Sequence, residues 1–389
     1  MPDKEIVYFE VFDVVDKNIY AQFLSRNILV KISLDSDRAE VLTFEDKYRY
    51  KHCTSKDQKI YFADNGGEAF VIYDITSKKE TVYSLESHEK TDNNIVTVER
   101  YDECIFIVSQ YTGIIYIYDI VNKKLEKDYT LNRFVKKKNG ERVECLLKCW
   151  KIDGYLYLRA AVGNLYETFR YDLTERYLEK IEGSVFSSEM INTYYYDNKL
   201  YILKDNFNLV IWDIKNNAID TIVMTDLYQL LNADKDGHMF SIIAVTQKNI
   251  WLFPSVENED IYIYDMSGGR ISRYDRYPSD FFYLDRKNWT KYSSLKASGN
   301  YIYVAARSSN YYLVIDAETG LGTWKTVYVP YSDGYYCNLI DKERKKNGER
   351  SVLYEGNIPL KAYLSYSIEE SGNAAQPDSI GKDIWEKLK

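Results

Sequence analysis

The chain has 389 residues, with 51 Lys and Arg against 59 Asp and Glu, and so carries a formal net charge of −8. This acidic balance argues against a nucleic-acid-binding surface, which requires an excess of Lys and Arg on one face. No apolar run approaches the ~18 residues of a membrane span, and the opening MPDKEIVYFE lacks the apolar core of a signal peptide. We therefore expect a cytoplasmic protein without a membrane span.

The five cysteines are few, odd in number and without paired spacing, as expected of reduced thiols. Cys145 and Cys149 lie four residues apart in a predicted strand, which places them about 13 Å apart at ~3.3 Å per residue. That separation is too large for one zinc ion or for a disulfide. The sequence also has no Gly-rich phosphate loop and no G-x-S-x-G sequence. We therefore predict neither a metal nor a cofactor.

A strand-like pattern with an aromatic third residue recurs along the chain, most clearly in DNKLYILKDNFNLVIWDI at 197–214. Apolar residues alternate with period two, as strands require. The aromatic residues of the seven copies are Tyr20, Tyr61, Phe106, Tyr157, Tyr201, Trp251 and Tyr303. Intervals between them run from 41 to 52 residues, the length of one four-stranded blade of a β-propeller.

Six of these copies are followed, after a short loop, by another predicted strand that ends in aspartate. The six residues are Asp74, Asp119, Asp172, Asp213, Asp265 and Asp316. An aspartate in this position can accept hydrogen bonds from backbone amides two residues further on and so fix the turn. Because the repeat puts one carboxylate in each blade, we interpret them as turn residues and not as a converging catalytic set.

Further strands complete each repeat. Residues 94–102 and 190–198 are candidates for innermost strands, and residues 80–85 and 218–223 for outermost ones. The sequence thus predicts an all-β fold, a β-propeller with four-stranded antiparallel blades.

The number of blades depends on the C-terminal part of the chain. Tyr354 falls 51 residues after Tyr303, the right period for a degenerate eighth copy that continues into residues 359–368. The segment 6–9 could supply its missing outer strand and close the ring without exposed edges. We therefore favour eight blades in a single domain over residues 1–370, with seven as the alternative.

The last segment, residues 371–389, departs from the repeat. Its small and polar start is typical of a linker. Ile380, Ile384, Trp385 and Leu388 then recur at helical spacing, and Ser379 is a suitable N-cap. We expect a linker and a short C-terminal amphipathic helix, which docks either on the chain's own ring or on a partner.

The stretch VIDAETGLGTW at 314–324 resembles the repeat of quinoprotein-like propellers, in which an Asp, a Thr-Gly turn and a Trp recur in each blade. The other copies are looser, and a kelch-like repeat is similar in quality, although only Gly66-Gly67 approaches the double glycine of kelch repeats. The resemblance implies the architecture and carries over no functional residues and no cofactor.

Long connections between blades indicate where a ligand would bind. Loops beyond ~12 residues in a compact fold are usually functional or disordered, and residues 224–238 and 274–289 are this long and rich in aromatics. The candidate ligand-binding residues there are Tyr228, His238, Tyr277, Phe281, Tyr283, Asp285, Arg286 and Trp289, and Arg159 and Arg307 join them at the ends of apolar strands. The aromatics could instead fold the loop down on the ring, and the arginines could form ion pairs.

One of these loops contains NADKDG at 232–237, which matches the opening half of a calcium-binding loop. Ile243 stands where the closing acid should lie, and without a bidentate carboxylate Ca²⁺ would be held poorly. We therefore interpret the segment as an Asx-rich turn.

Two functions fit the sequence. The first is a non-catalytic propeller that binds a protein or glycan partner through its long-loop face, since exposed Tyr, Trp and Arg are typical of such contacts. The second is an enzyme that acts on a saccharide or a small acidic metabolite at the mouth of the ring, with His238 and either Tyr228 or Asp285 as acid and base. Because the sequence shows no assembled catalytic motif, we favour binding.

Overall fold

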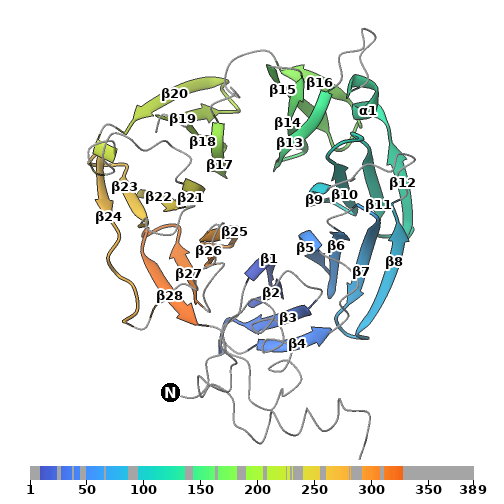
Figure 1. Ribbon diagram of the computed structural model, residues 1–389, viewed down its shortest axis with the longest axis horizontal. Helices are drawn as coiled ribbons and strands as arrows, with labels where there is room; N and C mark the ends of the chain where they lie inside the picture. Colours follow the sequence, from blue (N-terminus) through green and yellow to red (C-terminus); the bar gives the residue numbers. More distant parts are fainter. Residues whose placement is uncertain are drawn as a thin grey trace, which may run out of the picture.

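The computed structural model describes residues 9–23, 28–36, 39–43, 50–64, 67–85, 95–135, 143–162, 165–181, 190–204, 208–224, 226–227, 230, 240–254, 260–279, 281, 291–306 and 311–326. These residues form seven four-stranded antiparallel sheets arranged as blades around a central axis (Figure 1). Each blade consists of four strands that are consecutive in the chain, so the strand order of every sheet follows the sequence.

In each blade the first strand lies nearest the axis and the fourth lies on the rim (Figure 1). The first strands are β1 (Phe9–Val15), β5 (Tyr50–Lys56), β9 (Ile95–Tyr101), β13 (Val143–Ile152), β17 (Met190–Tyr196), β21 (Phe240–Val245) and β25 (Tyr292–Ser298). The second strands are β2 (Asn18–Phe23), β6 (Lys59–Asp64), β10 (Cys104–Ser109), β14 (Tyr155–Val162), β18 (Lys199–Lys204), β22 (Asn249–Pro254) and β26 (Tyr301–Ala306).

The outer half of each blade has the same regularity. The third strands are β3 (Ile28–Ser33), β7 (Ala69–Asp74), β11 (Ile115–Asp119), β15 (Leu165–Asp172), β19 (Asn208–Asp213), β23 (Tyr262–Asp265) and β27 (Tyr311–Asp316). The fourth strands are β4 (Ala39–Thr43), β8 (Lys79–Ser84), β12 (Lys124–Asp128), β16 (Leu178–Ile181), β20 (Ala218–Val223), β24 (Arg270–Arg273) and β28 (Gly322–Thr326). Helix α1 (Thr130–Val135) precedes β13, and no helix among the described residues is long and apolar enough to cross a membrane.

The ring closes with seven blades, so the expectation of eight is wrong and the alternative count is correct. The segment 6–9 does not begin an outer strand of an eighth blade, because Phe9 starts β1, the innermost strand of the first blade. This strand packs against β25 of the seventh blade and leaves no place between them for another sheet. The repeat-like segment around Tyr354 and the predicted helix in 371–389 lie outside the described residues.

Two turns per blade distinguish the two ends of the ring. The hairpin between the first and second strands has two residues in six of the blades, and aspartate with a positive φ opens it in five of them, at Asp16, Asp57, Asp102, Asp153 and Asp197. Asp and Asn tolerate this backbone region better than other residues with a side chain. We call this end the hairpin face, and the opposite end, where strands two and three and successive blades are joined, the loop face.

The aspartates at the ends of the third strands are turn residues, as predicted. The Asp119 carboxylate accepts hydrogen bonds of 2.9 Å from the amides of Val121 and Asn122, and the equivalent bonds form at Asp74, Asp172, Asp213, Asp265 and Asp316. They hold the turn between the third and fourth strands on the hairpin face.

The blades pack through the alternate residues of their strands. In β14, Leu156 and Leu158 face the third blade, whereas Tyr157 faces the fifth, where its ring lies 5.7 Å from that of Trp212 in an edge-on arrangement. Similar apolar clusters fill the spaces between the other successive blades from the first to the seventh. The core is therefore a ring of interblade clusters.

Candidate functional site

One pair of residues in the fourth blade departs from the repeat. Lys148 of β13 lies directly opposite Arg159 of β14 in the antiparallel register. The equivalent pairs in the other blades are Val11–Gln22, His52–Ala63, Thr97–Val108, Asn192–Leu203, Ile242–Phe253 and Ser294–Ala305. None of these six contains a Lys, Arg, Asp or Glu. Like charges directly opposite each other destabilise a sheet, so this pair sets the fourth blade apart from the others.

The register shows what this pair faces. Directly paired residues project to the same side of a sheet, so Lys148 and Arg159 face the fifth blade, as the neighbouring pair Trp150–Tyr157 does. Tyr157 packs on Trp212, which is paired with Leu200. Lys148 and Arg159 lie two residues closer to the loop face than Trp150 and Tyr157. Thr193 and Ile202, a directly opposed pair in the fifth blade, lie two residues closer to the loop face than Leu200 and its partner Tyr195. The two pairs are therefore at the same level of the adjacent blades.

Thr193 carries a polar group on the side of the fifth blade that faces the fourth. Its hydroxyl is buried and makes no hydrogen bond within the part of the chain that the structure describes. Thr168, which is paired with Arg159 on the other side of β14, is also buried, at 5% exposure. A buried hydroxyl without a partner costs about 1–3 kcal/mol, and a ligand oxygen would relieve that cost.

The two cations are poorly solvated. Burial and the neighbouring Arg159 lower the pKa of Lys148 to about 8. Burial likewise lowers the pKa of Arg159, which is only 6% exposed. The Arg159 guanidinium lies 4.3 Å from the centre of the Tyr166 ring, and this ring is 40% exposed. The pair therefore consists of a buried Arg159 and a partly buried Lys148, and its edge is an exposed tyrosine on the loop face.

Two other tyrosines are exposed on the loop face of the adjoining third blade. Tyr111 follows β10 and Tyr129 follows β12, and each is 41% exposed. The neighbouring Gln110 holds this loop to the fourth blade, because its carbonyl accepts a 2.9 Å hydrogen bond from the amide of Leu146 in β13. Tyr111 therefore sits beside the strand that carries Lys148.

The predicted aromatic residues that the structure describes lie elsewhere. The Tyr277 ring stacks on Trp324 at 5.8 Å and meets Phe281 at 5.1 Å, and Phe281 lies 4.7 Å from Trp324. This part of the loop folds onto β28, so Tyr277 and Phe281 pack between the sixth and seventh blades. Arg159, the third described candidate, lies in the fourth blade and is not brought together with them. The remaining seven candidates, Tyr228, His238, Tyr283, Asp285, Arg286, Trp289 and Arg307, lie outside the described residues.

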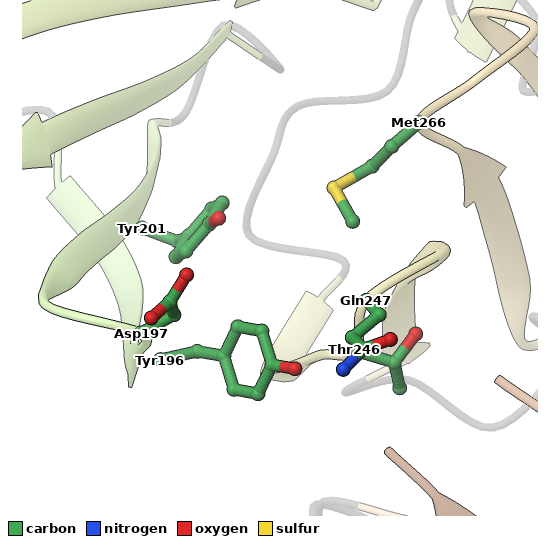
Figure 2. Close-up of a pocket in the computed structure, with 6 residues that line it drawn as sticks. All are labelled: Tyr196, Asp197, Tyr201, Thr246, Gln247 and Met266. Carbon is green, nitrogen blue, oxygen red and sulfur yellow. The ribbon is translucent and has the colours of Figure 1, made fainter. Parts of the chain in front are cut away.

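A separate cavity of about 500 Å³ opens between the fifth and sixth blades on the hairpin face. Figure 2 shows Tyr196, Asp197 and Tyr201 on one side of it and Thr246, Gln247 and Met266 on the other. It lies at the end of the ring opposite the exposed tyrosines and shares no residue with the Lys148–Arg159 pair.

Sequence reasoning found Arg159 and missed Lys148, Thr193 and Tyr166. The signal for Lys148 was present, because alignment of the seven first strands puts a lysine where the others have Val, His, Thr, Asn, Ile and Ser. The sequence around Thr193 contains no comparable departure from the repeat. Thr193 becomes a candidate only because Lys148 and Arg159 lie at the same level of the neighbouring blade.

Comparisons with known proteins support the architecture. No protein-family profile matches the chain, and no curated protein is similar in sequence. YCF48 from Cyanidioschyzon merolae is similar in structure, with a TM-score of 0.55 at 12% identity over 82% of this chain and 97% of that one. A chain of the mitotic checkpoint complex has a TM-score of 0.52 at 10% identity, over 84% and 92% of the two chains.

PorZ, a surface component of the type-IX secretion system of Porphyromonas gingivalis, has a TM-score of 0.52 at 9% identity. That match covers 84% of this chain and 39% of PorZ, so the chain spans well under half the length of that protein. At these identities the similarity shows the β-propeller repeat fold, and it assigns no residue or ligand.

Proposed function

We propose that the protein is a non-catalytic binding scaffold, which holds a protein or glycan partner on its loop face over the third and fourth blades. An anionic group of that partner, a carboxylate, sulfate or phosphate, enters the space between the fourth and fifth blades. There it meets the Lys148 ammonium and the Arg159 guanidinium.

The observation that carries this proposal is the Lys148–Arg159 pair itself. The repeat puts uncharged or weakly basic residues at the six equivalent positions, and the pair costs stability through mutual repulsion and burial. An anion bound between them would offset both costs. Arg is suited to planar oxyanions because its N–H groups bind them in a bidentate manner, and the Thr193 hydroxyl could donate a further hydrogen bond.

The surroundings suit a macromolecular partner. Interface hot spots are enriched in Tyr and Arg around a desolvated centre. Tyr166 stacks directly on Arg159, and Tyr111 and Tyr129 are exposed on the same face of the adjoining blade. An acidic glycan or an acidic loop of a protein would place its anion on the pair and its apolar faces on these rings.

Binding can be tested on arrays of acidic and neutral glycans and peptides, followed by affinity measurements on the best ligand. We expect acidic members to be preferred, and Lys148→Met and Arg159→Met each to weaken binding at least tenfold. Lys180→Met is the matched control, because Lys180 is an exposed cation on β16 of the same blade. Equal binding of neutral members, or unchanged affinity in Lys148→Met, would contradict the proposal.

A second candidate function rests on the lowered pKa of Lys148. An amine with a pKa of about 8 is partly neutral near pH 7.5, and a desolvated lysine beside another cation is a suitable nucleophile for a carbonyl group. The protein would then act on a small acidic carbonyl compound held by Arg159. Borohydride treatment in the presence of a 2-oxo acid distinguishes the two functions. A reduced adduct at Lys148 supports the enzyme, and its absence supports the scaffold.

A further inference from the structure

The cavity between the fifth and sixth blades is lined by a hairpin that departs from the repeat. The turn between β21 and β22 has three residues, Thr246 to Lys248, where the other six blades have two. The Thr246 hydroxyl accepts a 2.8 Å hydrogen bond from the amide of Asn249 and fixes this longer turn.

This longer turn is hydrogen-bonded to the seventh blade. The amide of Gln247 donates a 2.9 Å hydrogen bond to the carbonyl of Ala317, and the Asn249 side chain donates one of 3.2 Å to the carbonyl of Gly320. Both bonds tie the turn to the seventh blade. The space left beside β17 and β18 is the cavity.

Glycine at position 320 permits the close approach of this turn to the seventh blade. A Cβ on Gly320 would come within 2.5 Å of Asn249 Nδ2, and its φ of +70° also disfavours other residues. A Cβ on Gly322 would come within 2.7 Å of the Trp251 ring. Thus these two glycines of the motif GLGTW let the sixth and seventh blades approach closely.

The cavity has an aromatic and anionic lining. Tyr196 and Tyr201 supply rings, Met266 supplies a thioether opposite them, and the Asp197 carboxylate lies beside Tyr201 (Figure 2). A hydrogen bond between Gln247 and Tyr196 joins the two blades. Asp197 also opens a two-residue turn, as aspartates do in four other blades. The repeat therefore accounts for an aspartate at position 197, but it does not account for the cavity beside this aspartate.

The electrostatic field in the cavity is negative. Burial first, and then the carboxylate of Asp197, raise the pKa of both Tyr196 and Tyr201. Glu318, which follows the Ala317 that accepts the Gln247 hydrogen bond, also raises the pKa of Tyr196. Both tyrosines therefore remain neutral at physiological pH, and they offer ring faces and hydroxyl groups next to a carboxylate.

We propose that this cavity binds an organic cation, an alkylammonium or guanidinium group, in contact with the Asp197 carboxylate and the rings of Tyr196 and Tyr201. Aromatic faces attract a cation within about 6 Å of the ring centre, and the attraction grows when the site is desolvated. The soft, polarisable sulfur of Met266 suits the methyl or methylene groups that surround such a cation. A volume of about 500 Å³ is ample for a small amine or for a Lys or Arg side chain of a peptide.

Choline and its neutral isostere 3,3-dimethylbutan-1-ol test the proposal by calorimetric titration of the full chain. We expect choline to bind with a millimolar or lower Kd and the alcohol to bind at least tenfold more weakly. Asp197→Asn removes the charge and keeps a residue that tolerates the turn conformation, so it should weaken choline binding at least tenfold. Asp102→Asn is the matched control, since Asp102 occupies the same turn position in the third blade.

Each outcome decides the question. A tenfold preference for choline that is lost in Asp197→Asn and kept in Asp102→Asn supports the site. Equal binding of choline and the alcohol, no binding of either, or unchanged choline affinity in Asp197→Asn overturns it. Because Asp197→Asn could disturb the hairpin, its melting temperature is compared with that of Asp102→Asn. Tyr201→Phe, which keeps the ring, should retain most of the choline affinity.

Discussion

Ser55 of β5 donates a 2.6 Å hydrogen bond to the Asp13 carboxylate of β1, and so joins the first two blades next to the axis. Lys296 of β25 belongs to the same group. Burial alone would lower the pKa of Lys296, but the carboxylates of Asp13 and of Glu99 in β9 together raise it. Innermost strands of the first, second, third and seventh blades are thus coupled electrostatically at the hub, including the two blades that close the ring.

Replacement of Asp13 should destabilise this closure. Asp13→Asn removes the carboxylate that accepts the Ser55 hydrogen bond and that does most to raise the pKa of Lys296. A hydrogen bond to a charged group contributes about 1.5–3 kcal/mol, so we expect a loss of about 1–3 kcal/mol in the free energy of unfolding, measured by urea titration at pH 7. Asp16→Asn, in the exposed turn of the same hairpin, should change it by less than about 0.5 kcal/mol. Equal effects of the two variants would contradict the role of the hub.

Replacement of Lys148 should stabilise the protein. The pKa of Lys148 falls from its usual value of about 10.4 to about 8 in the fold, so the unfolded chain binds the proton more tightly between these values. The partly buried ammonium therefore lowers the free energy of unfolding below pH 8, and this cost is relieved as pH rises toward about 10.4. We expect Lys148→Met to raise the free energy of unfolding by about 1–3 kcal/mol at pH 7, and the gain to shrink by pH 10. A loss of stability at pH 7 would contradict this reading.

The turn aspartates should make the fold sensitive to acid. Backbone and side-chain hydrogen bonds lower the pKa of Asp74, Asp119, Asp213, Asp265 and Asp316. The stability that they contribute is complete above the unfolded carboxyl pKa of about 4 and is lost as pH falls through the lower folded values. We expect the melting temperature to fall steeply below pH 4, and Asp119→Asn, which keeps a turn-forming side chain, to show a shallower fall. Identical pH profiles would exclude this role for Asp119.

Gly320 should tolerate no side chain. Gly320→Ala adds a contact of 2.5 Å with Asn249 Nδ2 to the cost of a positive φ. Gly299, with a φ of +57°, has nothing within 4 Å of an added Cβ and measures the cost of the backbone alone. We expect Gly320→Ala to lower the melting temperature by several degrees more than Gly299→Ala. It should also weaken choline binding, because the turn that borders the cavity moves.

The repeat was predictable because strand periodicity and turn chemistry are local. The seven second strands, the innermost strands at 94–102 and 190–198, and the turn aspartates are all confirmed. The number of blades was not, since closure depends on how β1 packs against β25, which are more than 270 residues apart in the chain. A period alone counts repeats and does not show which of them join the ring.

The candidate sites depended still more on contacts between blades. Tyr277 was a candidate ligand-binding residue, and its ring stacks on Trp324, which lies 47 residues further along the chain. The equal level of Lys148 and Thr193 in two adjacent blades follows only from the register of both sheets. The cytoplasmic location, the domain limits at 370 and the C-terminal helix remain predictions from the sequence.

The proposed anion site is tested most directly by the affinity of the wild type and of Lys148→Met for the best acidic ligand, measured together with their stabilities at pH 7. We predict that Lys148→Met is more stable and binds at least tenfold more weakly, because the lysine is kept for the ligand at a cost to the fold. A variant that binds as tightly as the wild type would contradict the assignment of the site to an anion.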